Sequence, residues 1–179
     1  MDFVYNEGGR AAAGYKGRAG VCVVRAIAVA TQKLYREVYD AINALALAER
    51  ARRGRRSSAR SGVGRTTYER YLRHAGWEWV PTMQIGCGCR VHLRAEELPK
   101  GRLVVRLSRH LTAVIDGVIH DIYNPDRRGI RCVYGYFKPA QLTEEPERVS
   151  TTNKPDRKRS QGNEVTSKSL WAGHTKQRP

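Results

Sequence analysis

Long apolar runs are missing from this chain of 179 residues, because nowhere do about 18 apolar residues follow one another. That absence argues against a transmembrane helix. The N-terminus also lacks a basic region followed by an apolar stretch, so we expect no secretory signal. We therefore expect a soluble protein without a membrane partner, one that is not secreted and that resides in the cytoplasm or in association with a virion.

Cysteine is scarce, with four residues in the whole chain: Cys22, Cys87, Cys89 and Cys132. Cys87 and Cys89 are too close in sequence to pair comfortably, so we expect reduced thiols and no disulfide framework. Cys87, Cys89 and His92 have a weak resemblance to a zinc site, but their spacing is wrong for the ordinary structural ones. Small residues in a glycine-rich turn are the preferred interpretation. We expect no metal and no cofactor.

Acidic residues are few, 17 against 33 basic ones, which gives a formal net charge of +16. Between positions 50 and 65 the chain has seven arginines and no acid. Such a segment cannot bury a face, so we predict a mobile basic loop over residues 52–65. By itself it is most often a solvated insertion, but uncompensated arginines also suit phosphate contacts. The arginines expected to contact a polyanion are Arg52, Arg53, Arg55, Arg56, Arg60 and Arg65. No motif for reading nucleic acid accompanies them, so such binding should be nonspecific and salt-dependent.

Composition divides the chain into parts. Residues 1–14 are rich in glycine and alanine with little periodicity, which predicts a flexible N-terminal arm. Residues 15–140 contain the periodic apolar segments of one domain of ordinary size. Residues 141–179 lose apolar side chains and fill with polar and basic ones, which predicts a disordered basic tail.

Hydrophobic periodicity predicts helices first and strands afterwards. An apolar helix begins at or just before Cys22 and ends near Ala30; it is interrupted by a charge only at Arg25, which implies burial. A second helix extends to about residue 51, and a third, short one ends at Gly76. Strands are predicted at residues 77–81, 90–93, 102–107, 111–115, 118–123 and 131–137. We therefore predict an α+β fold in which N-terminal helices pack on a C-terminal antiparallel sheet.

A β-hairpin is predicted around Asp116 and Gly117, because this dipeptide between alternating apolar runs favours a two-residue type I′ turn. Ile115 then pairs with Val118, and counting outward places His110 and Asp121 on the same face as diagonal neighbours across the ladder. Side chains in those positions can reach one another. This is the geometry of a basic imidazole oriented by a carboxylate, although a register slip of one residue would reverse it.

Cys22 is the candidate nucleophile. The first turn of a helix lowers the pKa of a thiol through its unpaired N–H groups and the positive end of the helix dipole. His110 would complete the activation by forming a thiolate–imidazolium pair, and the backbone N–H of Cys22 would help to stabilise an oxyanion. The alternative for an isolated cysteine in an apolar helix is a small buried hydrophobic residue.

Taken together, Cys22, His110 and Asp121 resemble the triad of the papain-like cysteine peptidase superfamily, especially its compact C39-type members and similar bacterial and phage proteins. The resemblance covers residues 15–137. It implies a papain-like fold in which the nucleophile begins a buried helix, the histidine begins a strand, and an acid on the neighbouring strand orients it.

Two positions depart from that family pattern. Papain-like sequences have a glutamine or asparagine six residues before the cysteine as an oxyanion donor, and Lys16 stands there in this chain. C39-like sequences often place proline directly after the orienting acid, which leaves Asn124 and Asp126 as alternatives to Asp121.

Two functions follow as expectations. The first is a thiol hydrolase, peptidase-like or amidase-like, that acts on a peptide, isopeptide or related amide bond of a protein or peptide substrate. The second is a non-catalytic basic protein, associated with a virion or another assembly, that keeps a peptidase-like fold and contacts nucleic acid through its arginine-rich loop.

Overall fold

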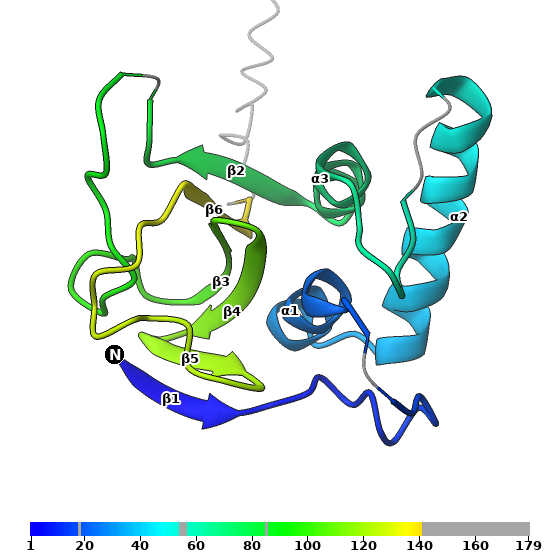
Figure 1. Ribbon diagram of the computed structural model, residues 1–179, viewed down its shortest axis with the longest axis horizontal. Helices are drawn as coiled ribbons and strands as arrows, with labels where there is room; N and C mark the ends of the chain where they lie inside the picture. The colour runs from blue at the N-terminus through cyan, green and yellow to red at the C-terminus, as the bar shows by residue number, and fades with distance from the viewer. Residues whose placement is uncertain (18, 54–56, 85, 141–179) are drawn as a thin grey trace, which may run out of the picture. The chain divides into compact units, whose positions relative to one another are not determined.

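The computed structural model describes residues 1–17, 19–53, 57–84 and 86–140 (Figure 1). These residues belong to one compact unit, Met1–Leu142. The tail that we predicted from residue 141 onward lies outside the described residues. In the ranges that the structure describes, no helix combines the length and the apolar character needed to cross a membrane.

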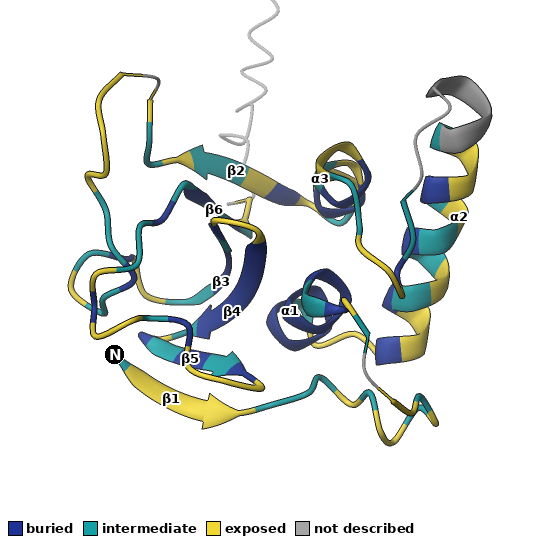
Figure 2. Cartoon of the chain, viewed as in Figure 1, coloured by how far each residue is buried: buried dark blue, intermediate teal, exposed yellow. Residues whose placement is uncertain are grey.

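The helices of this unit are α1 (Cys22–Thr31), α2 (Tyr35–Arg53) and α3 (Arg65–His74). Every residue of α1 from Val23 to Ala30 is buried, because α1 contacts the sheet on one side and α2 on the other. Figure 2 shows this contrast: α1 is dark blue for most of its length, whereas α2 is exposed along its outer side. The predicted burial of the apolar helix is confirmed.

The strands form one six-stranded sheet in the order β1-β5-β4-β3-β6-β2. Their bounds are β1 (Asp2–Tyr5), β2 (Trp77–Pro81), β3 (Arg102–Leu107), β4 (His110–Ile115), β5 (Val118–Asp121) and β6 (Gly135–Pro139). All neighbours are antiparallel except β1 and β5, so the sheet is mixed. This corrects the prediction of an antiparallel sheet built only from the C-terminal part, because the N-terminal strand β1 adds to it in parallel. The α+β class predicted from the element order is confirmed. Figure 1 shows the sheet curving, with the helices against its outer side.

The two faces of the sheet belong to different apolar clusters. Along β3, Val104 packs in the cluster that includes the helices, whereas Leu103 and Val105 pack in a second cluster with Ile119 of β5. Because successive side chains of a strand point to opposite faces, both faces of β3 are buried. The central strands are therefore packed on both faces, which fixes the positions of side chains at the strand ends.

The predicted register of the hairpin β4–β5 is confirmed. Ile115 pairs with Val118, and the next two pairs outward fall as expected. Asp116 and Gly117 at the turn have positive φ angles of 50° and 87°, as a type I′ turn requires. The turn chemistry alone was sufficient to align the two strands.

The structure corrects the prediction of a loosely held N-terminal arm. Asp2–Tyr5 form the edge strand β1, which pairs in parallel with β5. All four side chains of β1 are exposed, so the strand is held by main-chain pairing and leaves no alternating apolar pattern in the sequence.

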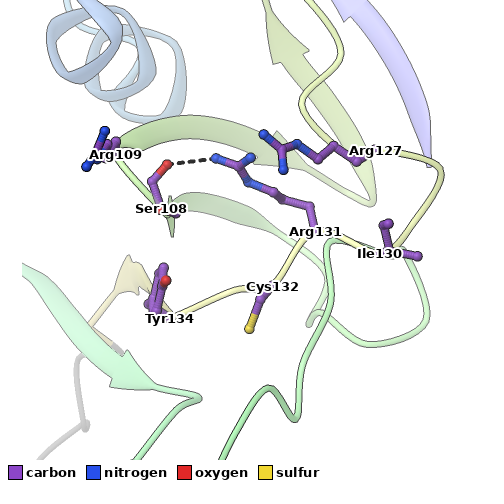
Figure 3. A pocket seen from close by; sticks show the side chains of 7 residues that line it. All are labelled: Ser108, Arg109, Arg127, Ile130, Arg131, Cys132 and Tyr134. Atoms are coloured by element: carbon purple, nitrogen blue, oxygen red, sulfur yellow. Dashed lines mark hydrogen bonds between the residues drawn. The ribbon is translucent and has the colours of Figure 1, made fainter.

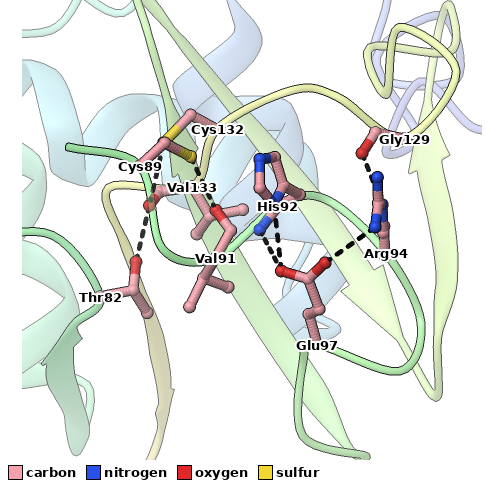
Figure 4. Close-up of polar contacts among 9 residues, drawn as sticks. All are labelled: Thr82, Cys89, Val91, His92, Arg94, Glu97, Gly129, Cys132 and Val133. Carbon is pink, nitrogen blue, oxygen red and sulfur yellow. Dashed lines mark hydrogen bonds and ion pairs between the residues drawn. A yellow bond between two sulfur atoms is a disulfide. The ribbon is translucent and has the colours of Figure 1, made fainter.

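The loop between β2 and β3 also differs from prediction. The segment predicted as a strand at residues 90–93 and the first part of the one predicted at 131–137 meet only through an isolated bridge between His92 and Cys132, and β6 begins at Gly135. Beside it, Cys89 and Cys132 form a disulfide with their Cα atoms 5.8 Å apart (Figure 4). The expectation of four reduced thiols is therefore wrong for this pair; Cys22 and Cys87 are free. Sequence spacing could not predict a pairing across 43 positions.

The predicted mobile basic loop over residues 52–65 is corrected in part. Arg52 and Arg53 continue the backbone of α2, and α3 begins at Arg65. Between the helices, Ser58 and Gly62 exchange main-chain hydrogen bonds. Ala59 is fully buried and its N–H donates to Oδ1 of Asn43. Arg55 and Arg56 lie outside the described residues, as do the side chains of Arg52 and Arg53.

Candidate active site

The three residues predicted to form a triad stand at the ends of regular elements. Cys22 is the first residue of α1, His110 the first of β4 and Asp121 the last of β5. Because β4 and β5 are antiparallel, the start of one lies beside the end of the other. The buried helix α1 packs against β4, which brings its first turn to the same edge of the sheet.

The imidazole of His110 is held by Asp121. Nε2 of His110 lies 2.7 Å from Oδ2 of Asp121, and the two side chains are only 8% and 1% exposed. The backbone N–H of Ile122 donates to the other carboxylate oxygen at 2.7 Å. The sequence-based choice of Asp121 as the partner of His110 agrees with this geometry, and Asn124 instead accepts a hydrogen bond from the N–H of Asp126.

Asp121 also forms a buried ion pair that sequence reasoning did not assign. Nη2 and Nε of Arg25 lie 2.8 and 3.2 Å from Oδ1 of Asp121. Burial by itself would raise the pKa of the Asp121 carboxyl, but the hydrogen bond with His110 and the charge of Arg25 lower it below its usual value. Asp121 is thus kept ionised between two cationic partners.

Cys22 and His110 polarise each other. Burial would raise the pKa of the Cys22 thiol, but hydrogen bonds with His110 and with the Leu111 backbone N–H reverse that effect, and the net pKa is lowered. For His110, burial acts to lower the pKa, whereas Asp121 and Cys22 raise it to about 9. Both directions favour a thiolate beside an imidazolium at neutral pH.

Tyr123 is a further neighbour of the imidazole. Its hydroxyl lies 3.3 Å from Nδ1 of His110, and the two rings are 5.2 Å apart at their centroids. Since Nε2 is occupied by Asp121, Nδ1 is the ring nitrogen left for the sulfur of Cys22. Tyr123 is about half exposed, so its ring covers the imidazole from the solvent side.

A cavity of about 730 Å³ opens beside Cys22 and His110. Tyr68 of α3 and Tyr134, just before β6, are among the residues that line it. The sulfur and the imidazole therefore face a space of the size that small-molecule and peptide ligands occupy in proteins.

Lys16, predicted at the oxyanion position, is not among the residues that line this cavity. It lies on a separate cavity of about 250 Å³, together with Arg60. Its backbone carbonyl accepts a hydrogen bond from Arg10. The structure thus does not bring Lys16 to Cys22, and of the described predicted polyanion contacts only Arg65 lines the cavity that holds Cys22.

Two of the three residues considered as zinc ligands, Cys89 and His92, have other partners in this structure. Cys89 is bonded to Cys132, and His92 contacts Glu97 at 3.3 Å between Nδ1 and Oε2 (Figure 4). A cysteine binds zinc as a thiolate, and a disulfide sulfur does not provide one. Among the residues whose side chains are described, no cluster of three or more histidine, cysteine, aspartate or glutamate residues has the arrangement to hold a metal ion.

Arg25 and Tyr123 are the neighbours that the sequence analysis missed. Arg25 was noticed as the only charge in the apolar helix, and it stands three residues after Cys22, which places both on neighbouring positions of one helix face. The sequence therefore indicated that α1 places the positive charge of Arg25 near the sulfur of Cys22. Tyr123 lies beyond the end of β5. The hairpin register, counted outward from Ile115 and Val118, places it opposite His110, so its position was predictable although no role was assigned to it.

Comparisons with models of protein families, with curated proteins and with solved structures found no match. The geometry of the site is therefore the basis for assigning a function.

Proposed function

We propose that the protein is a thiol hydrolase with a papain-like fold and triad, which cleaves a peptide, isopeptide or related amide bond. The observation that supports this most strongly is the buried pair of Asp121 and His110 on the cavity that Cys22 also lines, where the pKa of the thiol is lowered and that of the imidazole is raised to about 9. A buried cysteine that served only as a hydrophobic residue would not need such partners.

In the first half of the proposed reaction, the sulfur of Cys22 attacks the carbonyl carbon of the amide. The C–N bond of the tetrahedral adduct then breaks while His110 gives its proton to the departing amine. The acyl group remains on Cys22 as a thioester. Asp121 holds the imidazole in position throughout and stabilises its positive charge.

In the second half, neutral His110 takes a proton from water, and the resulting hydroxide attacks the thioester carbonyl. The C–S bond breaks, the carboxylic product leaves, and the thiolate–imidazolium pair is restored. The N–H groups of the first turn of α1 have no partner within the helix, so the N–H of Cys22 is available to the oxyanion.

The proposal is tested by the rate at which iodoacetamide labels each free cysteine, measured by mass spectrometry at about pH 6, where an ordinary thiol is almost entirely protonated. Cys87 is exposed and provides a comparison within the same molecule. We expect Cys22 to react faster than Cys87. His110→Ala should slow the labelling of Cys22 by about a hundredfold, since an unassisted thiol loses its thiolate at this pH. The matched control is His92→Ala, which should leave the rate at Cys22 unchanged.

Turnover is tested separately with a peptide library whose digestion is followed by mass spectrometry. New termini should appear with the wild type and be absent with Cys22→Ala. If Cys22 and Cys87 are labelled equally and slowly, and no new termini appear, the hydrolase proposal is wrong.

The second candidate is a non-catalytic basic protein that binds a polyanion. It is favoured by Lys16, which does not line the cavity at Cys22 and so leaves the family's oxyanion position without its donor. Slow labelling of Cys22 together with salt-dependent retention of DNA would support this candidate. Retention that is unchanged after deletion of residues 52–65 would show that the arginine-rich segment is not responsible.

A further inference from the structure

The cavity at Cys22 is one part of a longer cleft. Ser108, Arg109 and Tyr134 line both this cavity and a second one of about 660 Å³. Arg65, Arg106 and Tyr134 line both the first cavity and a third one of about 280 Å³. The three spaces therefore adjoin one another, with Tyr134 in the wall of each. A chain bound across Cys22 would have either neighbouring cavity beside it.

The walls of this cleft carry charge of one sign. Its five arginines are Arg65, Arg106, Arg109, Arg127 and Arg131. No aspartate or glutamate is found among the described residues that line any of the three spaces. A concave surface lined by one sign of charge concentrates its field and attracts ligands of the opposite sign.

Most of these arginines have no acidic partner. Arg65 is paired with Glu69. In the described part of the chain, none of the other four forms an ion pair with a carboxylate. Asp126 is near in sequence to Arg127, but its carboxylate contacts the N-terminal amino group and the N–H of Arg128. The positive charges are thus left for a ligand.

Arg131 is held in place by one hydrogen bond, and part of its guanidinium group has no partner. Its Nη2 donates to the backbone carbonyl of Ser108 at 2.7 Å, and its Nε is buried without any hydrogen-bond partner. Figure 3 shows the side chains of Arg127 and Arg131 reaching into the same cavity, with Arg109 on its far side. Arg131 lines the cavity, so the guanidinium N–H groups that are not bonded to Ser108 or buried can donate to an arriving carboxylate.

We infer that the substrate is an acidic polypeptide segment, whose aspartate or glutamate side chains bind to Arg109, Arg127 and Arg131 while the scissile amide lies at Cys22. The inference rests on the proposed function, since that reaction requires an amide carbonyl and therefore a polypeptide. Arginine binds carboxylates through paired parallel hydrogen bonds, which gives orientation as well as attraction. The carboxylates adjacent to the cleaved bond thus determine which bonds reach the sulfur.

The test uses the full chain and two fluorescein-labelled peptides of identical length, one with consecutive glutamates and one with glutamines in their place. Binding is measured by fluorescence anisotropy at low salt. We expect the glutamate peptide to bind about tenfold more tightly, with a difference that shrinks as salt is added.

The arginines are tested with the double variant Arg109→Gln, Arg127→Gln. Both residues are exposed, so the substitution removes charge without opening a core. The matched control is Arg70→Gln, Arg73→Gln, which removes two exposed arginines of α3 that line none of the three spaces. The first variant should lose most of the preference for glutamate, and the control should keep it. Equal losses in both variants would overturn the inference, because they would indicate only a general response to net charge.

Protection of Cys22 locates the bound peptide. The glutamate peptide should slow the labelling of Cys22 by iodoacetamide and leave that of Cys87 unchanged; absence of protection overturns the inference. An oligothymidine that protects Cys22 more strongly than the glutamate peptide also overturns it, in favour of nucleic acid. The proposed function is judged by a different readout, the labelling of Cys22 without peptide. Fast labelling with no preference for glutamate therefore rejects the acidic substrate and leaves the hydrolase intact.

Discussion

The described part of the chain contains two places where a histidine meets an acidic side chain close to a cysteine. At the start of α1, His110 and Asp121 are 2.7 Å apart, and their side chains are 8% and 1% exposed. In the loop between β2 and β3, His92 and Glu97 are 3.3 Å apart, and their side chains are 31% and 24% exposed. The residue types match, but the surroundings do not.

The sulfurs differ in the same way. Cys22 is free and lines the same cavity as His110, whereas Cys89 is joined to Cys132. The first group stands on elements that are packed on both faces, so its members cannot separate without disturbing the core. The second stands on a loop that a disulfide joins to the segment before β6. The same residue types therefore influence one another's protonation much more strongly where helices and strands bury them than on an exposed loop.

The largest expected effect is on stability, when the arginine that pairs with each carboxylate is replaced. Arg25→Met should lower the free energy of unfolding by about 3 to 5 kcal/mol, because it removes one partner of a buried ion pair and leaves Asp121 undercompensated. Arg94→Met removes the partially exposed partner of Glu97 and should cost far less, because water screens the pair. Urea denaturation of both variants measures the difference. Equal losses would show that the two groups are not energetically distinct.

The second prediction concerns the covalent bond of the loop. Replacing Cys89 and Cys132 together by serine should lower the free energy of unfolding by about 2 to 4 kcal/mol, because the bond constrains the unfolded chain across a separation of 43 residues. Urea denaturation under non-reducing conditions measures the loss. If wild type and variant unfold at the same urea concentration, the loop does not depend on this bond.

The third prediction concerns the protonation of His110. Since its pKa is raised to about 9, the ring should remain protonated through the neutral range and lose its proton only as the pH rises through about 9. Cys22→Ser should lower that pKa, because one of its causes is the negative sulfur. NMR titration of the ring protons follows both changes, with the signals of His92 as the reference that Cys22→Ser leaves unmoved. A ring that titrates near its ordinary value in the wild type contradicts the ion pair.

The smallest expected effect is that of Tyr123→Phe. The Nδ1–H of an imidazolium cannot serve the sulfur and the tyrosine hydroxyl equally, so removing the hydroxyl should favour the contact with Cys22. We expect labelling of Cys22 at about pH 6 to become faster by about fivefold or less, which corresponds to one ordinary hydrogen bond. Tyr39→Phe, in α2, is the control. A large loss of reactivity would instead mean that Tyr123 is needed to hold the imidazole.

Much of the fold could be predicted because its indications are local. The apolar run after Cys22 predicts a buried helix, and the Asp116–Gly117 turn aligns β4 with β5. The edge strand β1 escaped prediction because its stabilising contacts are main-chain hydrogen bonds, which any sequence can form. The bond between Cys89 and Cys132 escaped for a related reason, since it depends on where two distant loops meet.

By itself, the sequence determined which residues could be chemically competent: a thiol at a helix start, and an imidazole and a carboxylate in register across a hairpin. Those relations follow from periodicity and turn chemistry, which act over a few residues. Only the tertiary structure decided that Arg25 neutralises Asp121, that Lys16 lies on another cavity, and that unpaired arginines line the cleft beside Cys22. These are contacts between segments far apart in the chain, and they depend on how the helices pack against the sheet, which no local pattern encodes.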